Sequence, residues 1–125
     1  MLKFLSVFGV VVIMFVFSGC VETVIPEDLN GEWIAENIPD TLYIVDDSNF
    51  YHSNESMHYD HYDYSVEGNS LLIGYSGKMM IFVKKTKHEF ELQGDDLTID
   101  FSNEFCFGFP KEKINYKRTQ KFILE

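Results

Sequence analysis

The most informative absence in this chain is basic charge in its first half. Residues 20–77 hold twelve acidic side chains and no lysine or arginine, whereas residues 78–125 hold nine basic and eight acidic ones. The formal net charge of the 125-residue chain is −10. A nucleic-acid-binding domain carries a basic face, so this composition argues against nucleic acid as a partner. The acidic half predicts a solvated face, or one that attracts cations or a basic partner.

Cysteines and long apolar runs are also scarce. There are two cysteines, Cys20 and Cys106. The longest apolar run, residues 4–17, falls short of the roughly 20 residues that a membrane-spanning helix needs. The chain also has no Gly-x-Ser-x-Gly elbow, HExxH pair, P-loop or dinucleotide-binding glycine pattern. We therefore expect neither an enzyme nor a bound cofactor.

The N-terminal residues are organised like an export signal. The apolar run is followed by Phe17-Ser18-Gly19-Cys20, and small residues before a cut suit a signal peptidase. The segment resembles a lipoprotein signal peptide, which is cleaved before a cysteine whose thiol then carries diacylglycerol. The resemblance implies a signal helix over residues 1–19, a lipid-anchored spacer over residues 20–28, and export to the cell envelope with Cys20 in the membrane. Phe17 departs from the aliphatic residue usual at that position.

Other interpretations of Cys20 stay open at this point. The segment could be an ordinary signal peptide with a chance cysteine, or an uncleaved membrane anchor. An exported chain with two cysteines could also form a Cys20–Cys106 disulfide. Lipidation of Cys20 would exclude that bridge and leave Cys106 alone. Because Cys106 stands between Phe105 and Phe107, we expect it to be a small buried apolar residue.

Residues 29–125 show strand alternation and no convincing helical period. Aromatic and β-branched residues recur between short clusters of Gly, Asn, Asp and Ser, a pattern typical of antiparallel β proteins. We expect one all-β domain, with about eight to ten strands that close into a barrel. The predicted strands are residues 29–36, 41–45, 50–52, 57–66, 71–75, 78–84, 87–92, 97–101, 104–109 and 114–121.

A ten-residue repeat indicates two hairpins in this domain. Residues 64–73 and 90–99 both read aromatic, polar, aliphatic, polar, Gly, Asn or Asp, polar, Leu, any residue, Ile. Glycine next to Asn or Asp can supply the positive φ of a tight hairpin loop. Two such hairpins predict an up-and-down meander, and closure of that meander into a barrel would remove its exposed edges.

Gly31-Glu32-Trp33 opens the first predicted strand, and Arg118 lies on the last. This combination resembles the short lipocalin-like domains of small microbial lipoproteins, whose G-x-W tryptophan closes one end of the barrel beneath a basic residue. The resemblance implies contact between Trp33 and Arg118 and a role in binding a small apolar ligand. A second role stays open for so short a domain. It could be a structural or interaction protein with a filled barrel, which docks a basic partner through its acidic half.

The phenylalanines near the C-terminus bear on the choice between these roles. In a regular strand the side chains of Phe101, Phe105, Phe107 and Phe109 would share one face. Barrels of about eight strands hold either packed side chains or one small ligand. A cavity lined by these rings would favour ligand binding, whereas a filled interior would favour interaction through the outer surface.

Side chains that can bind metals gather in one stretch, which contains His52, His58, Asp60, His61 and Asp63. Alternation along a strand would divide them between two faces, which works against a four-ligand site. A pair such as His58 and Asp60 could still join His52 or His88 across strands to hold a divalent ion. We expect a polar strand edge without a metal.

Asn54-Glu55-Ser56 matches the N-x-S glycosylation sequon. It falls in a predicted loop, so Asn54 is a candidate acceptor. Its use depends on whether the source organism glycosylates exported proteins.

Replacing Cys20 by serine tests the anchor. If Cys20 carries lipid, the mature protein partitions with membranes, because two or more acyl chains hold a protein durably on a bilayer. We expect Cys20→Ser to lose both the membrane association and the added mass of the acyl groups. Membrane fractionation and intact-protein mass spectrometry measure these two properties. A variant that stays in the membrane fraction, beside an uncleaved wild type, would contradict the lipoprotein interpretation.

Overall fold

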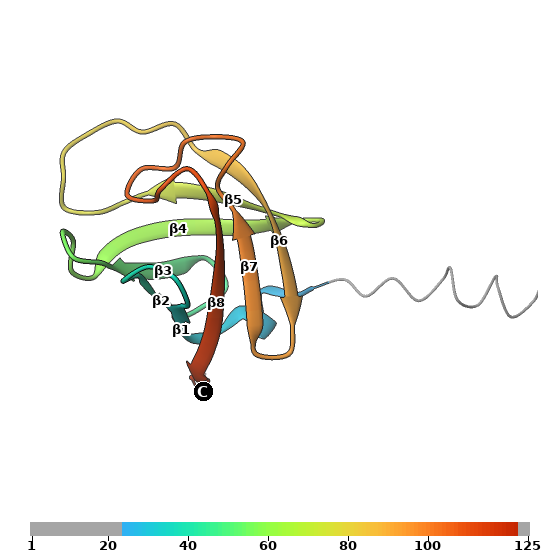
Figure 1. The fold of residues 1–125 in the computed structure, drawn as a ribbon. Coiled ribbons are helices and arrows are strands. Elements are labelled where there is room, and N and C mark those ends of the chain that lie inside the picture. Colours follow the sequence, from blue (N-terminus) through green and yellow to red (C-terminus); the bar gives the residue numbers. More distant parts are fainter. Residues whose placement is uncertain (1–23, 123–125) are drawn as a thin grey trace, which may run out of the picture.

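The protein folds into a closed antiparallel barrel, shown by a computed structural model that describes residues 24–122 (Figure 1). A short helix, η1 (Pro26–Leu29), precedes the sheet. The strands are β1 (Gly31–Ala35), β2 (Thr41–Ile44), β3 (Asn49–Ser53), β4 (Asp60–Glu67), β5 (Ser70–Tyr75), β6 (Thr86–Gln93), β7 (Asp96–Asp100) and β8 (Lys113–Gln120). Each strand pairs with its neighbours in sequence, and β1 pairs with β8. The predicted all-β meander that closes into a barrel is confirmed.

The predicted signal segment and Cys20 lie outside the described residues. Within residues 24–122, no helix has the length and apolar character needed to cross a membrane.

The connections between strands divide the barrel into two ends. At one end, which we call the loop end, lie residues 36–40, 54–59, 76–85 and 101–112. At the other, the turn end, lie residues 45–48, 68–69 and 94–95. The described chain begins at the turn end with η1 and returns there after β8. Figure 1 shows the β5–β6 loop and the start of the described chain on opposite sides of the barrel.

Alternation along the strands sorts side chains between interior and solvent. In β6 the side chains of Thr86, His88 and Phe90 are buried, whereas Lys87 and Glu89 between them are exposed. Most of the other strands show the same period of two, because successive strand side chains point to opposite faces of a sheet. The exception is β5, where neighbouring residues such as Ser70 and Leu71 are both buried. Most of the core therefore comes from every second residue of each strand.

Both copies of the predicted hairpin repeat form two-residue loops. Gly68 and Gly94 are the first loop residues, with φ of 63° and 61°. The β4–β5 pairing continues up to Gly68 and the β6–β7 pairing up to Gly94. Glycine adopts such positive φ values without steric cost, which explains why both repeats carry it at this position.

The predicted strand over residues 78–84 is wrong. These residues belong to the exposed loop 76–85 between β5 and β6. Strands β5 and β6 pair directly, with Leu71 opposite His88 and Ile73 opposite Thr86, so no position remains between them. Residues 79–83 are also apolar without interruption, and lack the alternation that sets one strand face toward the core.

The predicted strand over residues 104–109 is also wrong, and with it the expectation that four phenylalanines share one face. The chain turns within this segment, where Gly108 has a φ of 89°. Phe101 and Phe109 are buried, whereas Phe105 is 60% exposed and Phe107 is partly buried. The segment thus packs two rings into the loop end of the barrel and leaves a third in solvent.

Trp33 closes the interior at the turn end. Its side chain is fully buried, and its Nε1 donates a hydrogen bond of 2.8 Å to the carbonyl of Leu29. The guanidinium of Arg118 lies over the indole ring, 4.5 Å from its centroid. A cation over an aromatic face is attracted by the ring quadrupole.

Arg118 also joins segments that are distant in sequence. Its guanidinium donates hydrogen bonds of 2.8–3.0 Å to the carbonyls of Asp28, Asn30 and Gly94 and to the carboxylate of Asp95. One side chain therefore ties η1 and the β6–β7 turn to the ring of Trp33.

Replacing Arg118 should destabilise the barrel strongly. We expect Arg118→Ala to lower the free energy of unfolding by about 2–4 kcal/mol, because it removes the cation–π contact and leaves the partly buried carbonyls of Asp28 and Asn30 without their donor. Urea denaturation measures the change. The matched control is Lys117→Ala, which removes only solvent-exposed ion pairs to Glu36 and Asp96 and should leave the denaturation midpoint nearly unchanged. Equal effects of the two substitutions would contradict this role of Arg118.

Candidate functional site

The interior of the barrel is packed with side chains. Among apolar core residues that include Leu29, Phe101 and Phe109, the remaining cavity measures about 10 Å³. A single water molecule needs about 10–15 Å³, and small-molecule sites enclose about 300–1,000 Å³. This cavity among the described core residues therefore has no room for an organic ligand.

Four rings follow one another in the loop end, three of them stacked and the fourth, His88, tilted by 52° against Phe101. They follow the order His52, Phe109, Phe101, His88, with successive centroid distances of 4.1, 4.4 and 4.8 Å. The planes of His52 and Phe109 differ by 18°, and those of Phe109 and Phe101 by 11°. Because the two histidines lie on β3 and β6 and the two phenylalanines on segment 101–112, the stack holds that segment across the barrel.

Each histidine of the stack has one polar partner. His52 Nε2 lies 2.6 Å from Asp40 Oδ1, and the hydroxyl of Tyr116 donates to Asp40 Oδ2 at 3.2 Å. His88 Nε2 lies 2.6 Å from Thr86 Oγ1. All five residues are buried, so these contacts satisfy groups that would otherwise be costly to remove from water. The Nδ1 atoms of both histidines have no hydrogen-bond partner within the described chain.

Cys106 lies in the same end of the barrel and is 3% exposed, as predicted. Burial raises the pKa of its thiol to about 12. The thiolate is the nucleophilic form of cysteine, and at neutral pH this side chain is held as the thiol. Its surroundings are those of a packing residue.

His52 and Asp60 lie opposite each other in the β3–β4 pairing, but the other metal-ligand candidates do not join them. His52 and His88 are separated by two phenyl rings, and His58 lies in the exposed loop before β4. Asp60 accepts a hydrogen bond of 3.0 Å from the Tyr75 hydroxyl. Across residues 24–122, no group of three or more His, Cys, Asp or Glu side chains is arranged to hold a metal ion.

The sequon asparagine is engaged in the fold of the loop end. The Asn54 side-chain oxygen accepts hydrogen bonds of 2.8 Å from the backbone N–H groups of Ser56 and Met57. Its Nδ2, the atom that a glycan would modify, donates to the carbonyl of Gly108 at 3.5 Å. Asn54 thereby links the β3–β4 loop to segment 101–112.

The meander converts the charge asymmetry of the sequence into two sides of the barrel. Consecutive strands are neighbours, so β1–β4 and their loops form one continuous acidic wall. Every lysine and arginine of the described residues lies beyond it, on β6, on β8, directly after β8, or in the loops 76–85 and 101–112.

A shallow groove of about 380 Å³ crosses the acidic wall near the loop end. Ile34, Ile38 and Tyr43 supply apolar surface, and Glu55 and His58 line it as well. Ile34 is 42% exposed, although the residues before and after it on β1 are less accessible. We did not predict this groove from sequence. The feature of the sequence that could have indicated the groove is Ile34, an apolar residue on the outward face of β1 whose side chain points away from that of Trp33.

Tyr59 borders this region in an unusual backbone conformation. Its φ is 53°, a value uncommon for residues other than glycine. Its ring lies 5.0 Å from that of Tyr43, and a side-chain hydrogen bond between the two tyrosines raises the pKa of Tyr43 to about 12. The local conformation thus places an additional aromatic ring beside the groove.

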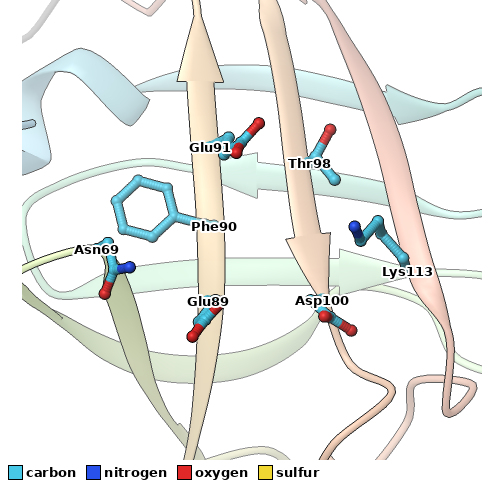
Figure 2. A pocket seen from close by; sticks show the side chains of 7 residues that line it. All are labelled: Asn69, Glu89, Phe90, Glu91, Thr98, Asp100 and Lys113. Carbon is cyan, nitrogen blue, oxygen red and sulfur yellow. The ribbon is translucent and has the colours of Figure 1, made fainter.

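A second hollow, of about 210 Å³, lies on the outer side of β6, β7 and β8 (Figure 2). Glu89, Glu91, Thr98, Asp100 and Lys113 surround it. Asp100 and Lys113 are opposite each other in the β7–β8 pairing. The hollow is polar, and its volume falls below the range of about 300–1,000 Å³ typical of ligand pockets.

Comparisons of this chain with models of protein families, with curated proteins and with solved structures find no match. Its function must therefore be argued from the chemistry of its interior and its outer surface.

The buried His88 should make the barrel sensitive to acid. Desolvation lowers the pKa of His88 below its ordinary value of 6.5. Protonation therefore favours the unfolded chain, so this contribution to stability is complete above pH 6.5 and is lost as the pH falls below it. We expect the free energy of unfolding to drop between about pH 7 and 5, measured by urea denaturation. His88→Gln, which does not titrate, should show a smaller drop, and an unchanged pH profile would contradict the assignment.

Proposed function

We propose that this chain is an exported lipoprotein with a lipocalin-like barrel, which acts at the cell envelope as an interaction or accessory module. The small residues Ser18 and Gly19 directly before Cys20 support a lipid anchor at that cysteine. The contact of Arg118 with Trp33 supports the lipocalin-like assignment. On this proposal the barrel is a rigid carrier, and its outer surface makes the functional contact.

The observation that carries this proposal is the filled interior. A cavity of about 10 Å³ cannot accept the small apolar ligand that a lipocalin-like domain would be expected to bind. The rings of His52, Phe109, Phe101 and His88 pack against one another in the loop end. A filled barrel favours the interaction role over the ligand-binding role.

The groove on the acidic wall indicates the chemistry of the partner. Glu32 and Ile34 lie on the outward face of β1, and Glu36 follows the strand directly, so carboxylates stand on both sides of an exposed apolar residue. Ile38 and Tyr43 extend the apolar surface. A partner segment with an apolar side chain flanked by lysine or arginine would complement this arrangement, because opposite potentials steer association and fix its register.

Site-specific photocrosslinking in the source cells tests the interaction role. A photoreactive residue at position 34 should give a discrete adduct with one partner protein, because Ile34 lies in the groove. The matched control is position 91 on β6, where Glu91 is exposed and strands β7 and β8 separate it from β1. Adducts at neither position, or equal adducts at both, would contradict the groove as the contact. Native mass spectrometry of the extracted protein separately tests the ligand-binding role. A small molecule retained at a stoichiometric amount would favour ligand binding over the interaction role.

A further inference from the structure

The β5–β6 loop exposes a continuous apolar tip. Met79, Met80, Ile81 and Phe82 are exposed by 52%, 101%, 41% and 109%, and Val83 follows them. Single exposed apolar side chains are ordinary on protein surfaces. A run that projects fully into solvent is different, because contiguous apolar surface marks sites that contact a protein or a membrane.

Lysines surround this tip. Lys78 precedes it and Lys84 and Lys85 follow it, and no acidic residue occurs between Glu67 and Glu89. Lys85 lies 3.2 Å from Asp63, whereas Lys78 and Lys84 form no ion pair within the described part of the chain. The loop is therefore locally basic in a chain whose net charge is −10.

The base of the loop is held while its tip projects. The Tyr75 hydroxyl accepts a hydrogen bond of 3.1 Å from the Met79 N–H and donates one of 3.0 Å to Asp60 Oδ2. Asp63, which pairs with Lys85, holds the other side of the base from β4. Figure 1 shows the yellow loop extending away from the strands at the loop end.

Two further loops add apolar surface at the same end. Phe105 is 60% exposed in segment 101–112, and Tyr59 is 59% exposed in the β3–β4 loop. The turn end has a different character, since its loops carry exposed carboxylates such as Asp46, Asp47 and Asp95. The β5–β6 loop is therefore the apolar, basic part of the loop end, whose other loops also carry acidic side chains such as Glu55 and Glu104.

We infer that the loop end docks on an anionic lipid bilayer, with the tip of residues 79–83 inserted among the acyl chains and Lys78 and Lys84 beside the headgroup phosphates. Apolar side chains gain free energy on leaving water for hydrocarbon. Lysine stems can lie along that apolar boundary while their ammonium groups stay at the surface. Each lysine near an anionic membrane surface adds attraction.

A bilayer fits this surface better than a protein partner does. Protein interfaces are depleted in lysine, and a protruding tip would need a matching pocket, whereas a bilayer accepts it anywhere along its surface. The net negative charge of the chain does not prevent docking, because charges separated by more than about 8–10 Å are largely screened at physiological salt. The acidic turn end points away from the docked end.

This contact does not involve the groove on the acidic wall. A lipid at Cys20 would hold the turn end, where the described chain begins, so the loop end of an anchored protein would meet a second membrane surface. The contact of the loop end can be tested with an unlipidated form that spans residues 21–125. Every residue of the hydrophobic core lies between Leu29 and Tyr116, so this form retains the whole folding unit.

Co-sedimentation with lipid vesicles is the decisive experiment. We expect binding to vesicles of phosphatidylcholine mixed with phosphatidylglycerol and much weaker binding to phosphatidylcholine alone. Met80→Ser combined with Phe82→Ser should reduce binding at least about tenfold, because it removes the inserted apolar groups. Lys78→Gln and Lys84→Gln should each reduce binding to the anionic vesicles by about fivefold.

Matched controls come from the turn end. Ile25→Ser removes an apolar side chain that is 50% exposed, and Lys121→Gln removes an exposed lysine; neither should change binding. In Phe82→Trp, the emission of the new tryptophan should shift to shorter wavelength on anionic vesicles, against the constant signal of buried Trp33. Thermal unfolding confirms that each variant is folded.

The inference is overturned if the wild type binds neither kind of vesicle, or if the Met80→Ser and Phe82→Ser double variant binds as well as the wild type. Concentration-dependent self-association that requires Phe82, in the absence of vesicle binding, would assign the tip to a contact between copies of the chain. Loss of binding in the Ile25→Ser control to the same extent would also refute a specific role for the loop.

Discussion

The contact of Arg118 with Trp33 is the constraint on which the rest of this structure depends. A meander of eight strands has two free edges until its first and last strands pair, and here the pairing places Arg118 opposite Trp33. The arginine lies over the indole ring and donates hydrogen bonds to a backbone carbonyl before β1 and to one in the β6–β7 turn. Closure therefore fixes the interior, removes the edges, and decides which segments lie at each end.

The closed barrel is too small to enclose both a core and a ligand. Alternate residues of every strand point inward, and little space remains among them. Segment 101–112 then adds Phe101 and Phe109, which stack between His52 and His88. This packing stabilises the short domain, because side chains that line an empty void lose van der Waals contacts. Because the interior is packed, we place any binding function on the outer surface of the barrel.

That outer surface owes its pattern to topology. In a meander, neighbours in sequence are neighbours in space, so the acidic first half of the chain becomes one wall of the barrel. Loops alternate between the two ends for the same reason, and the apolar loop 76–85 falls opposite the turn end where the described chain begins. The charged wall with its shallow groove and the apolar, basic β5–β6 loop are two separate surfaces, each with its own chemistry.

The sequence by itself determined the features that depend on local pattern. Strand alternation, the Gly68 and Gly94 hairpins, and the burial of Cys106 all follow from neighbouring residues. Local pattern misassigned residues 78–84 and 104–109, because apolar residues in a loop and in a strand look alike until the pairing partners are known. Only the tertiary structure decided that the interior is filled, that Ile34 borders a groove, and that no three of the metal-ligand candidates come together within the described residues. Each of these features depends on which distant segments come into contact when the barrel closes. Residue spacing along the chain does not predict those contacts.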